Sequence, residues 1–254
     1  MTSDSGVRLD CAGPVATVTL CRPDVLNAQT PAMWTALREF SRDLPGDVRV
    51  VIVRGEGRAF SAGLDLSLVS GEGMNSFTEM ARITPEESAD RIHGFQMGFT
   101  WLRRPDIVSI AAVQGHAIGA GFQLALACDL RVLADDAKLS MAEAALGLVP
   151  DLGGTKRLVE LVGYGRALEL CATARRVDAV EAERIGLANL VVPRADLDGA
   201  TNDLAAAVLN APRNAVIEVK ALLSGAADRS YAEQDRAERE AQTRRFRDLA
   251  GLGE

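Results

Sequence analysis

The 254-residue sequence contains few residues of the kinds that bind metal ions or form disulfide bonds. It has only two histidines and four cysteines, and the cysteines are too far apart in the sequence to form a CxxC pair. A metal site needs several such ligands at characteristic spacings, so we expect no bound metal ion. The scattered cysteines are typical of reduced thiols in a cytoplasmic protein.

A positively charged surface and long apolar runs are also missing. The formal net charge is −7, which argues against a protein that binds nucleic acids or anionic membranes. Residues 1–5 lack the basic and apolar regions of a signal peptide. Polar residues such as Gln114 and Gln123 interrupt the longest apolar runs before they could span a bilayer. We therefore expect a cytoplasmic protein with no nucleic-acid partner and no membrane partner.

Motifs that bind nucleotide phosphates are absent too. The turn Gly119-Ala120-Gly121 lacks the third glycine of a dinucleotide-binding GxGxxG motif, because Leu124 occupies that position. The sequence also contains no GxxxxGKS or GxxxxGKT phosphate loop. Neither kind of nucleotide-binding site is therefore expected.

Alternating strand and helix patterns predict an α/β fold. The chain is long enough to form one large domain with a sizeable core. Short runs of branched apolar residues predict strands at 15–20, 48–53, 107–113 and 130–133. Thr30 and Pro31 are a typical N-cap and first position for a helix over residues 32–44. Further helices are predicted at 85–102, 120–128, 155–162, 166–172, 179–185, 197–210, 214–223 and 232–249.

The predicted elements divide the chain into two parts. Residues 1–195 alternate between strands and helices, whereas residues 196–254 contain helical patterns without strands. Residues 70–84 form the one long segment predicted to be irregular, and such segments often line binding pockets.

Two glycine-containing turns could bind an oxygen atom that carries negative charge. Gly63 precedes a helix predicted to begin at Asp65, and Gly119 precedes the helix that begins near Ala120. Backbone N–H groups at a helix N-terminus are unpaired and carry partial positive charge. Two such donors directed at one thioester or ester oxygen would form an oxyanion hole. Taken alone, each turn is more often a simple structural turn.

Carboxyl groups are rare in the surrounding segment. Residues 107–128 contain no charged residue, and Glu143 then follows within an apolar stretch, with Asp151 eight residues later. Burying a carboxylate is unfavourable and displaces its pKa, so these two positions are candidates for proton transfer.

Five motifs together resemble the crotonase family, which comprises enoyl-CoA hydratases and isomerases. They occur in a consistent order across residues 7–230, and each would be weak evidence alone. The motifs are Arg22-Pro23 with Asn27-Ala28, GRAFSAGLDL at residues 57–66, VQGHAIGAG at residues 113–121, Cys128-Asp129, and GLVPDLGGTKRL at residues 147–158.

The resemblance implies a spiral of β-β-α turns and a helical C-terminal region that forms a homotrimer or a dimer of trimers. It also implies an acyl-CoA thioester as substrate, with no separate cofactor because coenzyme A is part of the substrate. The oxyanion hole would consist of the N–H groups of Leu64 and Ala120, while Ala62 and Arg22 would contact the substrate.

The acid–base positions depart from the hydratase pattern. Hydratases of this family carry glutamates at the positions of Gln123 and Glu143, and an amide cannot exchange a proton at neutral pH. Isomerases of the family resemble this chain in carrying an aspartate at the position of Asp151. We therefore expect Glu143, Asp151 and Gln123 to form the catalytic group and double-bond isomerisation to be the reaction. A 2-enoyl-CoA hydratase and a non-catalytic acyl-CoA-binding protein are the alternatives.

Each of these residues also has a simpler interpretation. Glu143 could be a surface acid at the end of a strand, and Gln123 could fill space beside the pocket. Asp151 could be the N-cap of the following helix, because aspartate is favoured there. Asp65 is expected to be a cap that steadies its loop, rather than a catalytic residue.

Overall fold

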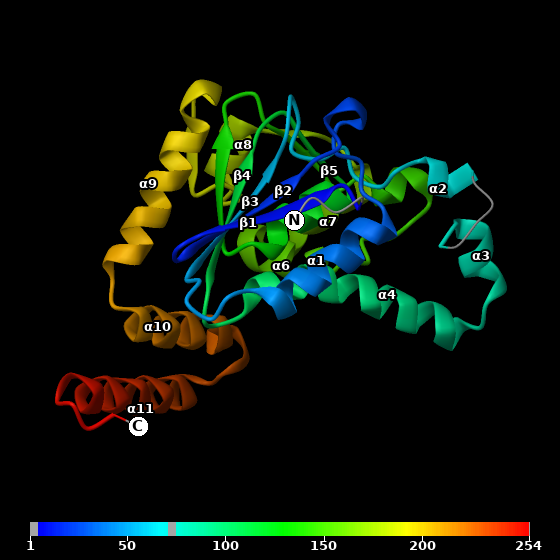
Figure 1. Cartoon of the computed structure of the whole chain (residues 1–254). Helices are drawn as coiled ribbons and strands as arrows, with labels where there is room; N and C mark the ends of the chain where they lie inside the picture. Colours follow the sequence, from blue (N-terminus) through cyan, green and yellow to red (C-terminus); the bar gives the residue numbers. More distant parts are fainter. Residues whose placement is uncertain (1–4, 71–74, 254) are drawn as a thin grey trace.

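The computed structural model describes residues 5–70 and 75–253, which form two β-sheets and a set of surrounding helices (Figure 1). The larger sheet has the strand order β1-β2-β3-β4-β6-β9. All neighbouring strands in it are parallel except β1 and β2. Its strands are β1 (Val7–Ala12), β2 (Val15–Leu20), β3 (Val50–Gly55), β4 (Val108–Val113), β6 (Leu130–Ala134) and β9 (Leu190–Val192). The smaller sheet contains β5 (His116–Ile118), β7 (Lys138–Ser140) and β8 (Val177–Asp178).

The helices follow the predicted pattern closely. Thr30 caps the first helix, since its side chain accepts a hydrogen bond from the Met33 N–H as expected for an N-cap. The helices are α1 (Pro31–Asp43), α2 (Ser67–Ser70), α3 (Phe77–Arg82), α4 (Pro85–Thr100), α5 (Ala120–Ala127), α6 (Gly154–Val162), α7 (Tyr164–Thr173), α8 (Ala179–Arg184), α9 (Leu197–Asn210), α10 (Arg213–Gly225) and α11 (Tyr231–Leu249).

The strands that the sequence predicted are the central, parallel ones. Every residue of β4 is buried. Both faces of a parallel sheet are covered, so its strands need apolar residues on both sides. This explains the continuous apolar sequence of β4. The sequence patterns did not predict β1, β5, β7, β8 or β9. Four of these have only two or three residues and little periodicity to detect.

Two apolar layers cover the larger sheet. Side chains alternate along β3, so Val51 and Val53 pack in the main core, whereas Ile52 packs on the opposite face. On that opposite face, Leu197 and Ala205 of α9 complete a second cluster. Figure 1 shows α9 running along this side of the sheet. The predicted α/β class is therefore confirmed.

The last two helices extend away from the sheet (Figure 1). Lys220 of α10 anchors them, because its ammonium group donates hydrogen bonds to the Asp129 carboxylate and the Ile107 carbonyl, both at 2.7 Å. Apolar side chains on this extension remain exposed, including Leu223 and Leu249. The homotrimer or dimer of trimers stays a prediction. Within the described ranges, no helix is long and apolar enough to cross a membrane.

Two local predictions were wrong. The segment predicted to be irregular contains α3, whose N-cap Ser76 accepts a hydrogen bond from the Glu79 N–H; residues 71–74 of that segment lie outside the described residues. The helix predicted to begin at Asp65 begins two residues later, at Ser67. A helix of one turn leaves too short a pattern for its first residue to be located from the sequence.

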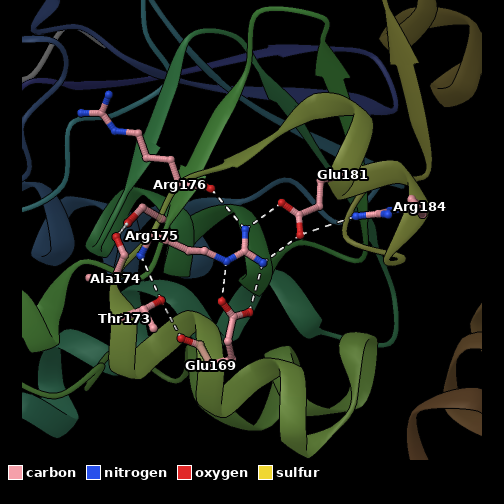
Figure 2. Close-up of polar contacts among 8 residues, drawn as sticks. Glu169, Thr173, Ala174, Arg175, Arg176, Glu181 and Arg184 are labelled. Carbon is pink, nitrogen blue, oxygen red and sulfur yellow. Dashed lines mark hydrogen bonds and ion pairs between the residues drawn. The ribbon is translucent and has the colours of Figure 1, made fainter.

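A cluster of charged side chains joins α7 to α8 (Figure 2). The Arg175 guanidinium donates hydrogen bonds to the carboxylates of both Glu169 and Glu181. Just before it, the Ala174 carbonyl accepts a hydrogen bond from the Ser140 hydroxyl at the end of β7, at 2.8 Å. These contacts hold α7 in place beside the short 3₁₀ helix that contains Glu143.

Candidate active site

One cavity of about 530 Å³ brings together most of the predicted site residues. Its lining includes residues from four separate parts of the sequence, which the fold assembles. Of the predicted site residues, it contains Ala62, Leu64, Ala120, Gln123, Glu143 and Asp151. The cavity therefore places two backbone turns and two carboxyl groups around one space.

The two glycine-containing turns lie side by side. The Ser61 N–H donates a hydrogen bond to the His116 carbonyl at 2.8 Å, and the Ile118 N–H donates one to the Ser61 carbonyl at 3.0 Å. Gly63 has a φ of +90°, and a Cβ there would lie 2.5 Å from the Ile118 carbonyl oxygen. Glycine is required at this position, because any other residue would separate the two turns.

The Leu64 and Ala120 N–H groups are available to a ligand. In the described part of the chain, neither donates a hydrogen bond to another residue. Ala120 is the first residue of α5, where the N–H groups have no partner within the helix. The partial positive charge of the helix N-terminus adds to the donor at this position. The pair thus has the chemistry of an oxyanion hole.

A buried polar network supports the first turn. Trp34 Nε1 donates to Gln29 Oε1 at 2.8 Å, and Gln29 Nε2 donates to the Ser61 hydroxyl at 3.1 Å. That hydroxyl donates to the Asn27 carbonyl and accepts from the Gly63 N–H. A satisfied network of this kind is rigid. The sequence analysis missed it, because its members are separated by up to 36 residues and none carries a charge.

Glu143 is buried in the cavity wall, with 8% of its surface exposed. It begins the 3₁₀ helix that follows β7. Because the side chain is buried there, the interpretation of Glu143 as a surface acid is wrong. Its Oε1 accepts a hydrogen bond from Gln123 at 2.7 Å, whereas its buried Oε2 has no partner in the described structure. Burial raises the pKa of Glu143; the Asp151 charge adds to this effect, and the Gln123 hydrogen bond opposes it.

Gln123 is not an inert space filler, because both ends of its amide are hydrogen-bonded. Nε2 donates to Glu143, while Oε1 accepts from the Leu152 N–H at 2.9 Å and from the Gly154 N–H at 3.3 Å. These partners assign the orientation of the amide. A Cβ at residue 154 would lie 2.8 Å from Gln123 Cγ, so a residue larger than glycine would displace the amide.

Asp151 lines the same cavity, on the segment before α6. The N-cap of α6 is Gly153, with no side-chain cap, so the interpretation of Asp151 as an N-cap is wrong. Gln96 of α4 holds the Asp151 backbone by donating to its carbonyl at 2.7 Å. Burial raises the pKa of the Asp151 carboxyl group. Both acids in the cavity are therefore easier to protonate than ordinary surface carboxyl groups.

Arg22 does not line the cavity. Its guanidinium donates to the Asp65 carboxylate at 2.9 Å and to the Ala28 carbonyl at 2.6 Å. The same carboxylate accepts from the Ser67 N–H, so Asp65 steadies the loop as the sequence predicted. Arg22 thus braces the loop that presents Ala62 and Leu64, and its contact with substrate stays a prediction.

Apolar side chains form the rest of the cavity. Many come from α1, α3 and α4, including Trp34, Phe77, Met80, Ile92 and Phe95, and others come from the segments around α2 and residues 146–152. The sequence analysis predicted helices here but did not identify these side chains, because an apolar helical stripe usually faces the core. No lysine, arginine or histidine occurs among the described lining residues. Nor do three or more described His, Cys, Asp or Glu residues cluster as metal ligands would.

Comparisons with known proteins agree with this geometry. The chain is 38% identical over 212 residues to carnitinyl-CoA dehydratase of Salmonella enteritidis, covering 82% of the chain and 76% of that protein. It is 32% identical over 222 residues to short-chain-enoyl-CoA hydratase of Clostridium acetobutylicum, covering 85% and 78%.

Solved structures give the same result. A Thermobifida fusca protein, described as an enoyl-CoA hydratase and crystallised with CoA, superposes with a TM-score of 0.91 at 50% identity. The match covers 97% of this chain and 95% of that one. A sequence model of the enoyl-CoA hydratase/isomerase family matches residues 11–250. With its paired turns and buried acids, this chain belongs to the enoyl-CoA hydratase/isomerase family.

Proposed function

We propose that this protein is an acyl-CoA isomerase that moves a carbon–carbon double bond along the acyl chain. Glu143 and Asp151 would transfer the protons, and the Leu64 and Ala120 N–H groups would stabilise the thioester enolate. The observation that carries the proposal is the content of the cavity: one buried and one partly buried carboxyl group, both with raised pKa values, and an amide already bonded at both ends.

The proposed reaction conserves protons. One carboxylate removes a proton from C2 of a 3-enoyl thioester, and the electrons move onto the thioester oxygen as a dienolate. The two N–H groups stabilise that negative charge, as an oxyanion hole does. The other carboxyl group then donates its proton at C4, which leaves a 2-enoyl thioester. Carboxyl groups with raised pKa values are suited to both steps near neutral pH.

Hydration of a 2-enoyl thioester is the second candidate. It is favoured by the names of the related proteins, because most of these names describe a hydratase. Hydration needs two groups that hold and activate one water molecule. The acceptor oxygen of Gln123 is occupied by two backbone N–H groups, so Asp151 would have to supply the second group. This requirement makes isomerisation the better match to the geometry.

A substrate panel read by mass spectrometry tests the proposal. The panel contains 3-enoyl-, dienoyl- and 2-enoyl-CoA thioesters of equal chain length. We expect the double bond to move faster than water adds, and Asp151→Asn to slow that movement by about 100-fold. Asp228→Asn is the matched control, because Asp228 is exposed and pairs with Lys156 on the surface.

The other outcomes identify the alternatives. Faster hydration than isomerisation would establish the hydratase and refute the proposal. Micromolar binding of every thioester without turnover would establish a non-catalytic acyl-CoA-binding protein.

A further inference from the structure

We propose that Gln123 gives the two carboxyl groups opposite roles, holding Glu143 ionised as the proton acceptor and leaving Asp151 protonated as the proton donor. In this arrangement Gln123 is a positioning residue, since it acts through Glu143. The inference rests on the proposed function, and it adds the direction in which the protons move.

The hydrogen bonds of Gln123 leave it no alternative orientation. Its Oε1 accepts from two backbone N–H groups, at Leu152 and Gly154, so a flipped amide would place its NH₂ group against two donors. Nε2 must therefore face Glu143 Oε1, 2.7 Å away. A donor held in this way stabilises the ionised form of Glu143 over the protonated form.

The same contact distinguishes the two carboxylate oxygens of Glu143. Glu143 Oε1 is occupied by Gln123, whereas Oε2 is buried without a partner and belongs to a residue of the cavity wall. An unpaired oxygen of a buried carboxylate is a strong acceptor, because nothing else there compensates its lost hydration.

Asp151 has a different environment. No described side chain donates a hydrogen bond to its carboxylate, and Gln96 bonds to its backbone carbonyl instead. Burial opposes ionisation of Asp151, and two ionised carboxylates lining one cavity would repel each other. Of the two acids, Asp151 therefore retains its proton when Glu143 is ionised.

The other titratable groups nearby do not reverse this order. Cys171 of α7 faces Glu143, and both burial and the Glu143 charge raise the pKa of its thiol, so it stays neutral. Arg103 approaches the segment that carries Asp151: its guanidinium would lie 3.6 Å from a Cβ at Gly153. No hydrogen bond or ion pair joins Arg103 to Asp151 among the described residues.

Direct titration of the two carboxyl groups tests the inference without any substrate. Infrared difference spectra of the full chain, recorded against pH, follow the loss of each protonated-carboxyl band. Glu143→Gln and Asp151→Asn assign the bands. We expect Glu143 to ionise at a lower pH than Asp151 in the wild-type protein. The reverse order would overturn the inference.

Two variants separate the two functions of the Gln123 amide. Gln123→Met removes both the donor and the acceptor, whereas Gln123→Glu keeps an acceptor for the Leu152 and Gly154 N–H groups. In each, Glu143 should ionise at a higher pH than in the wild type. In acidic solution, kcat/KM should fall roughly tenfold or more, since hydrogen bonds to charged groups are among the stronger ones. Gln123→Glu keeps the test valid if Gln123→Met does not fold.

Gln96→Met is the matched control. It removes a glutamine that anchors the same segment but donates nothing to Glu143, so the Glu143 titration should not move. Equal shifts in all three variants would assign Gln123 a merely structural role and overturn the inference. Failure of the proposed isomerase reaction would appear separately, as absent turnover in a protein whose carboxyl groups still titrate in the expected order.

Discussion

Two regions of this protein contain a pair of acidic side chains, and their environments are opposite. In the cavity, Glu143 is buried and Asp151 partly buried, no described lining residue is a cation, and loss of solvent raises the pKa of each acid. On the surface, the Arg175 guanidinium lies between Glu169 and Glu181 and lowers the pKa of both. Identical functional groups thus have raised pKa values in one place and lowered pKa values in the other, and only the first pair has the properties expected of proton carriers.

The surface pair is structural. Its hydrogen bonds to Arg175 satisfy the carboxylates and connect α7 to α8 (Figure 2). The cavity pair receives one side-chain hydrogen bond, from Gln123, and leaves a buried oxygen unpaired. An unsatisfied buried group lowers stability, so its presence beside two N–H donors indicates chemistry rather than folding.

The largest expected effect is the loss of activity in Glu143→Gln. Removing the proton acceptor should lower kcat/KM by about 10²–10⁴-fold, the usual contribution of general acid–base catalysis. Glu169→Gln is the same chemical change in the surface cluster and should leave kcat/KM within about twofold. Steady-state kinetics on the preferred thioester measures both. Equal losses would show that the two regions do not differ in the way proposed.

Substrate charge should have the next largest effect. The described cavity lining has two acids and no cation, so a carboxylate at the end of the acyl chain would be desolvated without a partner. We expect kcat/KM for an acyl chain ending in a carboxylate to be about 100-fold lower than for a neutral chain of equal length. Competition between the two thioesters in one reaction gives the ratio directly. A ratio near one would require a cation that reaches the cavity.

Stability should respond to pH in opposite directions in the two regions. Because folding raises the Glu143 pKa, its contribution is fully present below the unfolded pKa and is lost as pH rises through the folded pKa. Glu143→Gln should therefore raise Tm at pH 7, and the gain should shrink as the solution is acidified. Glu169 and Glu181 have lowered pKa values, so their stabilisation is present above the unfolded pKa and lost as pH falls through the folded pKa.

Arg175→Gln tests the surface side of that contrast. It should lower Tm at pH 7 by less than about 4 °C, because exposed ion pairs stabilise weakly. This loss of Tm should become smaller in acid. At pH 7 its sign is opposite to the Tm change expected for Glu143→Gln. Thermal melts of both variants at pH 7 and at acidic pH measure the two trends, and trends of the same sign would contradict the assigned environments.

Much of the fold could be predicted from local sequence. Thr30 and Pro31 located the start of α1, and the continuous branched run at β4 indicated a strand buried on both faces. The short strands β5, β7 and β8 could not be predicted in this way. Their stability comes from pairing with distant residues, such as Ile118 with Ser140, and a segment of two or three residues carries no period of its own.

The sequence by itself determined the family, the two turns and which residues could exchange protons, because motif spacing and side-chain chemistry are local properties. Only the tertiary structure decided what those residues contact. It directed the Gln123 amide toward Glu143, excluded Asp151 from capping α6 and placed both acids in the wall of one cavity. The physical reason is that a pKa depends on burial and on neighbours within a few ångströms, and the fold alone brings such neighbours together.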